Sequence, residues 1–316
     1  MSDETSSKPD QTIVFWVYLF MFILSVICSL FILSQFFVKP TLRKRLHNHI
    51  ILIVVTCSFI QVICELPFVL AFFRNQTALY PSYLFCTIWC LIDYPFNVII
   101  LMLICYGSIE RYLLVFHRNM ITNHLILLHY LPIAFCLIYP CVFYIGMICF
   151  YPCTQQYDYT QITCQGPCYL FEQIPGSADL LINMATPMTI RVIVNLTIII
   201  RVLHKKHRMK QQRKWKKNRF LVLQLMSIVF AHNLVWLPII LSLLYTLFSP
   251  VVEQAIIDLS VNMFTYSIYI VIMICPFISL GGLTDLHPTI YSNLCGRIQR
   301  QQSRVQPITH TPAGYI

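Results

Sequence analysis

Seven long runs of apolar residues restrict what this chain can fold into. Each run is longer than the roughly 18–20 residues that a helix needs to cross a hydrocarbon core. The runs cover residues 12–38, 46–73, 83–109, 125–149, 180–203, 220–248 and 256–283. The chain is 58% hydrophobic and 11% charged, which lies outside the range of soluble domains. The sequence therefore predicts an all-α membrane protein: a bundle of seven transmembrane helices, followed by a short amphipathic helix.

The basic residues that border these runs predict how the chain is oriented. The connections after the first, third and fifth runs carry Lys39, Arg118 and a basic stretch at 201–219, whereas Arg74 is the one basic residue of the alternate connections. Because loops rich in lysine and arginine stay in the cytoplasm, we expect an outside N-terminus and a multi-pass protein of the plasma membrane. The expected segments are an extracellular tail at 1–11, a membrane domain at 12–283, and a cytoplasmic amphipathic helix with a tail at 284–316.

The net charge of +10 fits this arrangement. Nearly all of the excess lies in short segments beside the apolar runs, where it sets the orientation and attracts anionic lipid of the inner leaflet. We therefore expect the partner of these basic residues to be the lipid bilayer and not a nucleic acid.

Several positions outside the runs are candidates for covalent modification. Asn75 begins an Asn-Gln-Thr glycosylation sequon in a connection expected outside the cell. Cys295 follows the last run and is a candidate palmitoylation site. An oxidising compartment favours disulfides among the cysteines in or beside the second outside connection. These are Cys149, Cys153, Cys164 and Cys168.

The third run carries the most specific motif. Glu110-Arg111-Tyr112 stands where this run is expected to meet the cytoplasm, and Cys86 lies 25 residues before Arg111, which is roughly 37 Å along a helix. This pairing resembles the third helix of rhodopsin-like (class A) G-protein-coupled receptors. The resemblance implies that Cys86 bonds to the second outside loop. It also implies that Glu110 holds Arg111 until activation releases the arginine towards a heterotrimeric G protein.

Later runs extend the resemblance. Val235-Trp236-Leu237-Pro238 is similar to the Cys-Trp-x-Pro motif of the sixth helix, although Val235 replaces the cysteine. In the seventh run Pro276 has the expected distance from Trp236. The Pro-x-x-Tyr pattern occurs instead at Pro288, but a seventh helix that reached Pro288 would place Asp285 and His287 in hydrocarbon. We therefore prefer Pro276. The resemblance implies an activation switch made of Glu110, Arg111, Tyr112, Pro187, Trp236, Pro238 and Pro276.

The chain also departs from the family pattern. A sodium site would need an Asp, a Ser and an Asn at positions that read Ser58, Ile100 and Cys275, so no metal is expected. Asn195 replaces a tyrosine that usually takes part in activation, His232 replaces a core aromatic residue, and Asn218 replaces an acidic partner of the triplet arginine. These substitutions indicate an outlying member of the family.

Asp93 is the main candidate for ligand binding. It stands at the position that, by the resemblance, pairs with the cationic group of amine and some peptide ligands, opposite Tyr269. The alternative is a carboxyl group that tyrosine hydroxyls and water keep neutral. The ligand-binding residues expected from the resemblance are Asp93, Asn183, Trp236, Ile239, Ile240, Tyr266 and Tyr269.

A peptide fits better than a small amine. Ile239 and Ile240 stand where amine receptors usually offer aromatic rings to an ammonium group. The second outside connection, at 150–177, is rich in tyrosine and predicts a disulfide-tied hairpin across which a peptide could lie. We prefer Cys168 as the partner of Cys86, with Cys153 bonded to Cys164. Cys164 remains open as the partner of Cys86.

Other function classes find less support. The sequence contains no HExxH or Gly-x-Ser-x-Gly motif and no paired carboxylates within the runs, so these signs of an enzyme are missing. No cofactor is expected. The ionisable residues Glu65, Asp93 and Arg191 are expected to be isolated from one another, which argues against a transport path. No role is assigned to Arg191. A ligand-binding receptor is therefore preferred over a divergent seven-span chemoreceptor or a small-solute transporter.

Overall fold

The computed structural model describes residues 11–43, 46–208, 229–245 and 254–282, and these residues contain helices and no strand. The first half comprises α1 (Gln11–Val38), α2 (Pro40–Arg43), α3 (Leu46–Cys64), α4 (Leu66–Asn75), α5 (Tyr83–Phe116) and α6 (Arg118–Asn123). Next come η1 (Ile126–Tyr130), α7 (Leu131–Ile145), η2 (Gly146–Phe150), η3 (Ile162–Gln165) and η4 (Cys168–Phe171). The remainder comprises α8 (Gln173–Asp179), η5 (Leu180–Ala185), α9 (Thr186–Arg208), the helix Val229–Tyr245, and α11 (Gln254–Gly282).

Five helical stretches are long and apolar enough to cross a membrane. They are Thr12–Val38, Asn48–Asn75, Tyr83–Phe116, Ile126–Phe150 and Gln173–Arg201. Two further apolar helices, Val229–Tyr245 and Tyr266–Leu280, are shorter within the described residues. Along α1, Trp16, Phe20 and Ile27 are each at least 60% exposed. Large apolar side chains in water would be unfavourable, so these helices indicate a multi-pass membrane protein.

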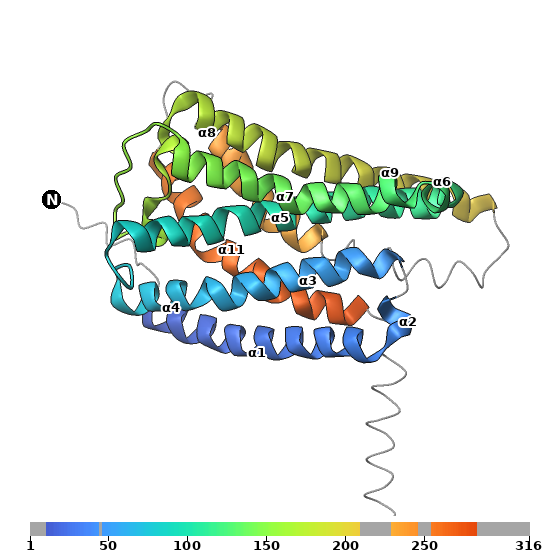
Figure 1. The fold of residues 1–316 in the computed structure, drawn as a ribbon, viewed down its shortest axis with the longest axis horizontal. Coiled ribbons are helices and arrows are strands. Elements are labelled where there is room, and N and C mark those ends of the chain that lie inside the picture. Colours follow the sequence, from blue (N-terminus) through green and yellow to red (C-terminus); the bar gives the residue numbers. More distant parts are fainter. Residues whose placement is uncertain (1–10, 44–45, 209–228, 246–253, 283–316) are drawn as a thin grey trace, which may run out of the picture.

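The long helices run side by side along the longest axis, with α5 near the middle (Figure 1). Helix α5 packs against α3, α7 and α9, while α1 packs against α3, α4 and α11. One end of the bundle carries both disulfides, and we call it the disulfide end. The opposite end carries α2, α6 and the last turns of α9, and we call it the basic end (Figure 1).

Prolines explain where the helices change course. Helix α3 ends at Cys64 and α4 begins with Leu66-Pro67, because Pro67 has no N–H to continue the ladder. The π-helical turn η5 directly precedes Pro187, where the widened ladder accommodates the missing donor. Pro238 and Pro276 lie within helices as expected.

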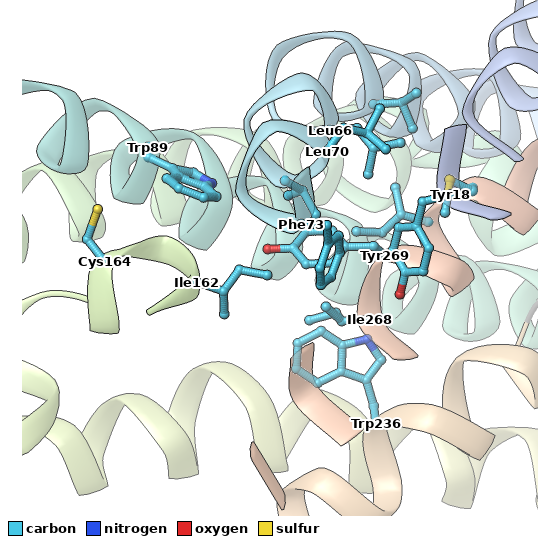
Figure 2. Packing of buried hydrophobic residues seen from close by; sticks show 14 of the residues in the cluster. Tyr18, Leu66, Leu70, Phe73, Trp89, Ile162, Cys164, Trp236, Ile268 and Tyr269 are labelled. Atoms are coloured by element: carbon cyan, nitrogen blue, oxygen red, sulfur yellow. The ribbon is translucent and has the colours of Figure 1, made fainter. Parts of the chain in front are cut away.

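The largest apolar cluster lies towards the disulfide end. It joins side chains from α1, α4, α5, α11 and the helix Val229–Tyr245 with two residues of the loop after η2. Figure 2 shows Phe73, Ile268 and Trp236 converging from three of these helices, and Ile162 reaching the cluster from the loop. This cluster forms the apolar surroundings of the polar group described next.

Candidate functional site

Two buried carboxyl groups meet inside the bundle. Glu65 stands at the junction of α3 and α4 and is 1% exposed, and Asp93 on α5 is 2% exposed. The two side chains are close enough to interact with each other. The prediction that the apolar runs hold no carboxylate pair, and that Glu65 and Asp93 are isolated, was therefore wrong. The pair forms through packing of α3 and α4 against α5, which spacing along the chain does not reveal.

Two amide side chains link the carboxyl groups into a network. Gln61 Nε2 donates to Glu65 Oε2 at 2.9 Å and to Asn97 Oδ1 at 3.3 Å. Asn97 Nδ2 donates to Asp93 Oδ1 at 2.5 Å. Each carboxyl group therefore accepts from one amide: Glu65 from Gln61 of α3, and Asp93 from Asn97 of α5.

Tyr269 of α11 lies beside this pair and interacts with both carboxyl groups. Neither its hydroxyl oxygen nor Glu65 Oε1 has hydrogen-bond geometry with another described group. Two carboxylates in apolar surroundings repel each other, and such a pair is stable when one proton is shared or a cation compensates the charge. The arrangement can therefore hold a proton or a cationic group between α4, α5 and α11.

The structure brings together most of the predicted ligand-binding residues. Tyr269, Trp236 and Ile240 belong to one buried cluster with the apolar residues of Figure 2. Tyr266 packs against the same cluster and stacks on Phe73 at 5.8 Å between ring centroids. Ile239 is buried but lies outside this cluster.

Asn183 takes part in a different network. Its Nδ2 donates to Asp179 Oδ1 at 2.6 Å, and its Oδ1 accepts from the Tyr139 hydroxyl at 3.0 Å. Asp179 is 1% exposed and also accepts from Tyr144 and Tyr169, each at 3.0 Å. The amide of Asn183 therefore joins α7 to η5, and its role as a ligand contact stays a prediction.

The disulfide pairing differs from the preferred prediction. Cys86 at the start of α5 bonds to Cys164, and Cys153 bonds to Cys168, so the alternative left open for Cys86 is correct. Thr163, Cys164 and Gln165 all have positive φ angles, as does Gly166, and this left-handed turn carries Cys164 to α5. Cys164 and Cys168 are both thiols only four residues apart, so the sequence does not tell which one bonds to Cys86. The fold of the turn decides in favour of Cys164.

The loop that carries these cysteines contains short 3-10 turns and no strand, so the predicted hairpin was wrong. Gln155 ties the loop together: its Oε1 accepts from Cys168 N at 2.6 Å and its Nε2 donates to Gly166 O at 3.2 Å. The backbone N–H and hydroxyl of Thr160 both donate to Asp158, which lowers the pKa of that exposed carboxyl group below its usual range. Side-chain hydrogen bonds and disulfides therefore take the place of strand pairing.

The Glu110-Arg111-Tyr112 triplet lies well inside α5, which continues to Phe116. Glu110 is 1% exposed and Arg111 is 6% exposed. Glu110 Oε1 lies 2.5 Å from His129 Nδ1, and His129 Nε2 lies 3.0 Å from His49 Nδ1. The Glu110 carboxyl group therefore contacts a histidine of η1, and it also lies close enough to Arg111 to interact electrostatically with the guanidinium group.

Arg111 has no hydrogen-bond partner at NH1 or NH2 among the described residues. Beside it in sequence, Tyr112 lies under the guanidinium group of Arg201, 5.2 Å from its ring centroid. Glu110 interacts electrostatically with Arg111, but two buried terminal nitrogens without acceptors are unfavourable, so this end of α5 can accept an acidic or carbonyl group from a partner. Sequence reasoning missed His129 because a histidine inside an apolar run carries no sign of which helix it faces.

Some predicted positions lie outside the described residues. They include Cys295 and the amphipathic helix at 284–316, together with Asn218 and most of the extracellular tail. Asn75 is exposed at the end of α4, and its glycosylation stays a prediction. Searches of protein-family models and of curated proteins found no match to this chain.

Proposed function

We propose that this protein is a rhodopsin-like receptor of the plasma membrane that binds a cationic extracellular ligand, preferably a peptide, and activates a heterotrimeric G protein. The observation that carries the proposal is the buried Arg111, whose terminal nitrogens have no partner among the described residues. The other end of the same helix is bonded through Cys86 to the loop at the disulfide end. One helix thereby connects a candidate ligand site with a candidate partner site.

Seven spans and an outside N-terminus are part of this proposal. Five membrane-length helices and two shorter apolar helices support the number of spans. Lys39, α6 and the end of α9 lie at the basic end, which the charge asymmetry assigns to the cytoplasm (Figure 1). Epitope tags at the two termini, probed on intact cells, should be accessible at the N-terminus and inaccessible at the C-terminus.

The proposed mechanism is a population shift between two arrangements of the helices. A cationic group between Glu65, Asp93 and Tyr269 would draw together the α3–α4 junction, α5 and α11. Trp236 packs in the same cluster, so this change would also reach the helix Val229–Tyr245. A ligand that binds one arrangement more tightly raises its population, and with it the affinity of the basic end for a G protein.

Replacing Arg111 with alanine tests the coupling. We expect G-protein nucleotide exchange by the purified receptor in nanodiscs to fall at least about tenfold, because the group that contacts the partner is lost. Lys39→Ala is the matched control, since it removes a positive charge at the same end without touching the triplet. If Arg111→Ala and Lys39→Ala exchange nucleotide at equal rates, Arg111 has no part in coupling.

Neutralising the carboxyl pair tests the ligand site. In a screen of cationic peptides and amines read out by G-protein dissociation, Asp93→Asn and Glu65→Gln should each reduce potency by roughly ten- to a hundredfold. The loss reflects one charge-assisted contact in low dielectric. Thr87→Ala, also on α5 but facing Tyr157, should keep the wild-type potency. Unchanged potency in both carboxyl variants would remove the pair from the ligand site.

Small-solute transport is the second candidate function. The Glu65–Asp93 pair favours it, because buried carboxyl groups that share a proton can also couple solute movement to proton movement. Flux of a cationic solute into liposomes, lost in Glu65→Gln but unaffected in Arg111→Ala, would favour transport over signalling. A divergent seven-span chemoreceptor would share the ligand site and would be distinguished by its ligand selectivity and its partner.

A further inference from the structure

Arg191 is a fully buried cation in the middle of the bundle. It lies on α9, one turn after Pro187, and is 0% exposed. Its NH2 group donates to Asn233 Oδ1 and to Met188 Sδ. Its Nε and NH1 groups have no hydrogen-bond partner among the described residues. One terminal nitrogen of the guanidinium group is therefore occupied, while the other terminal nitrogen and Nε retain their donors.

A second buried group with unused nitrogens lies close to this arginine. His232, on the helix Val229–Tyr245, is 3% exposed, and neither of its ring nitrogens has a hydrogen-bond partner in the described part of the chain. It is near enough to Arg191 for the two groups to interact electrostatically. Two helices thus bring buried nitrogen atoms without described hydrogen-bond partners close to each other.

Neighbouring residues fix Arg191 without neutralising it. Asn195 Nδ2 donates to the backbone carbonyl of Arg191 at 2.8 Å and to Ser108 Oγ at 3.0 Å, which ties α9 to α5. Cys105 of α5 also lies next to Arg191. No described carboxylate forms an ion pair with Arg191, so its charge has no compensation within this part of the protein.

A buried and unpaired guanidinium group is unfavourable by several kcal/mol, whereas a buried anion in hydrogen-bonding contact with it offsets much of that penalty. The Nε–H and NH1 groups of Arg191 can each still donate to an anion, and a neutral imidazole supplies one further N–H. We propose that Arg191, His232 and Asn233 belong to an internal binding site for a small inorganic anion of the chloride class. The guanidinium group and the imidazole ring are both nearly inaccessible, which excludes ligands with long apolar tails.

Anion binding at this place would join α9 to the helix Val229–Tyr245. Trp236, which packs in the cluster beside the carboxyl pair, stands one turn after His232 on that helix. The anion would therefore stabilise one position of this helix relative to α9 and act as an allosteric cofactor. This site is separate from the cationic-ligand site and does not depend on the proposed signalling function.

The test uses the purified full-length protein in nanodiscs and measures the thermal unfolding midpoint. Sodium gluconate is replaced stepwise by sodium chloride at constant ionic strength. The wild type should show a saturable rise of roughly 2–5 °C, which is the size expected from tight binding to the folded state. Sodium bromide should act like chloride. Arg191→Gln should abolish the rise, while Arg74→Gln, which removes an exposed arginine, should retain it.

A second variant and a second measurement cover the case in which Arg191→Gln does not fold. His232→Phe keeps a ring in the same place but removes the donor, and should weaken the chloride response several-fold. Bromide-soaked crystals should show anomalous scattering beside Arg191. An anion-independent midpoint in the wild type, or a response that survives in the arginine and histidine variants, would overturn the proposal.

Discussion

Replacing His129 with phenylalanine is expected to lower the unfolding free energy by about 3 kcal/mol, because the buried Glu110 carboxyl group would lose a hydrogen-bond partner. His129 is fully buried, and its Nδ1 lies 2.5 Å from Glu110 Oε1. Phenylalanine fills similar volume, so the loss reports the polar contact and not a cavity. In nanodiscs the thermal midpoint should fall by roughly 6–12 °C.

A double-mutant cycle separates this contact from general damage. Glu110→Gln removes the carboxylate that His129 contacts, so the double variant Glu110→Gln with His129→Phe should lose much less stability than the two single losses together. His124→Phe is the matched control, because His124 is exposed near the same end and should change the midpoint little. Additive losses in the cycle would show that His129 and Glu110 do not act as a pair.

Replacing Asp179 with alanine is expected to lower the unfolding free energy by about 3–4 kcal/mol. Three donors, from Tyr144, Tyr169 and Asn183, converge on this buried carboxylate, and each would lose its acceptor. Tyr169 belongs to the loop at the disulfide end, whereas Tyr144 belongs to α7. The variant should therefore also release the loop, which limited proteolysis between residues 150 and 173 would detect.

Asp158→Ala and Asp179→Asn are the controls for Asp179→Ala. Asp158→Ala removes an exposed carboxylate of the same loop that contacts Thr160 alone among the described side chains, and its midpoint should stay close to that of the wild type. Asp179→Asn retains one acceptor oxygen and should lose less stability than Asp179→Ala. If alanine at position 179 leaves both the midpoint and the cleavage pattern unchanged, the network does not hold the loop.

The positions of the long helices could be predicted from the sequence because hydrocarbon imposes one simple requirement on length and polarity. The first predicted span, 12–38, agrees with α1, and the last, 256–283, agrees with α11 to within a few residues. The third helix, α5, continues seven residues past its predicted end at 109, because its buried polar triplet interrupts the apolar pattern without ending the helix.

Pairings between distant residues could not be predicted in the same way. Glu65 meets Asp93, and Glu110 meets His129, only after helices from different parts of the chain have packed. The resemblance supplied Asp93 and Tyr269 but neither Glu65 nor His129. Similarly, Arg191 and His232 have no shared motif, and their nearness depends on how α9 lies against the helix Val229–Tyr245.

The lengths of the helices have a further consequence for the surrounding lipid. The 27 residues of the apolar stretch in α1 span about 40 Å, whereas an average hydrocarbon layer is roughly 30 Å thick. Tilting and local thickening of the bilayer must absorb this hydrophobic mismatch. Lipids with longer acyl chains would reduce that distortion, so a thicker bilayer should allow the long helices to tilt less.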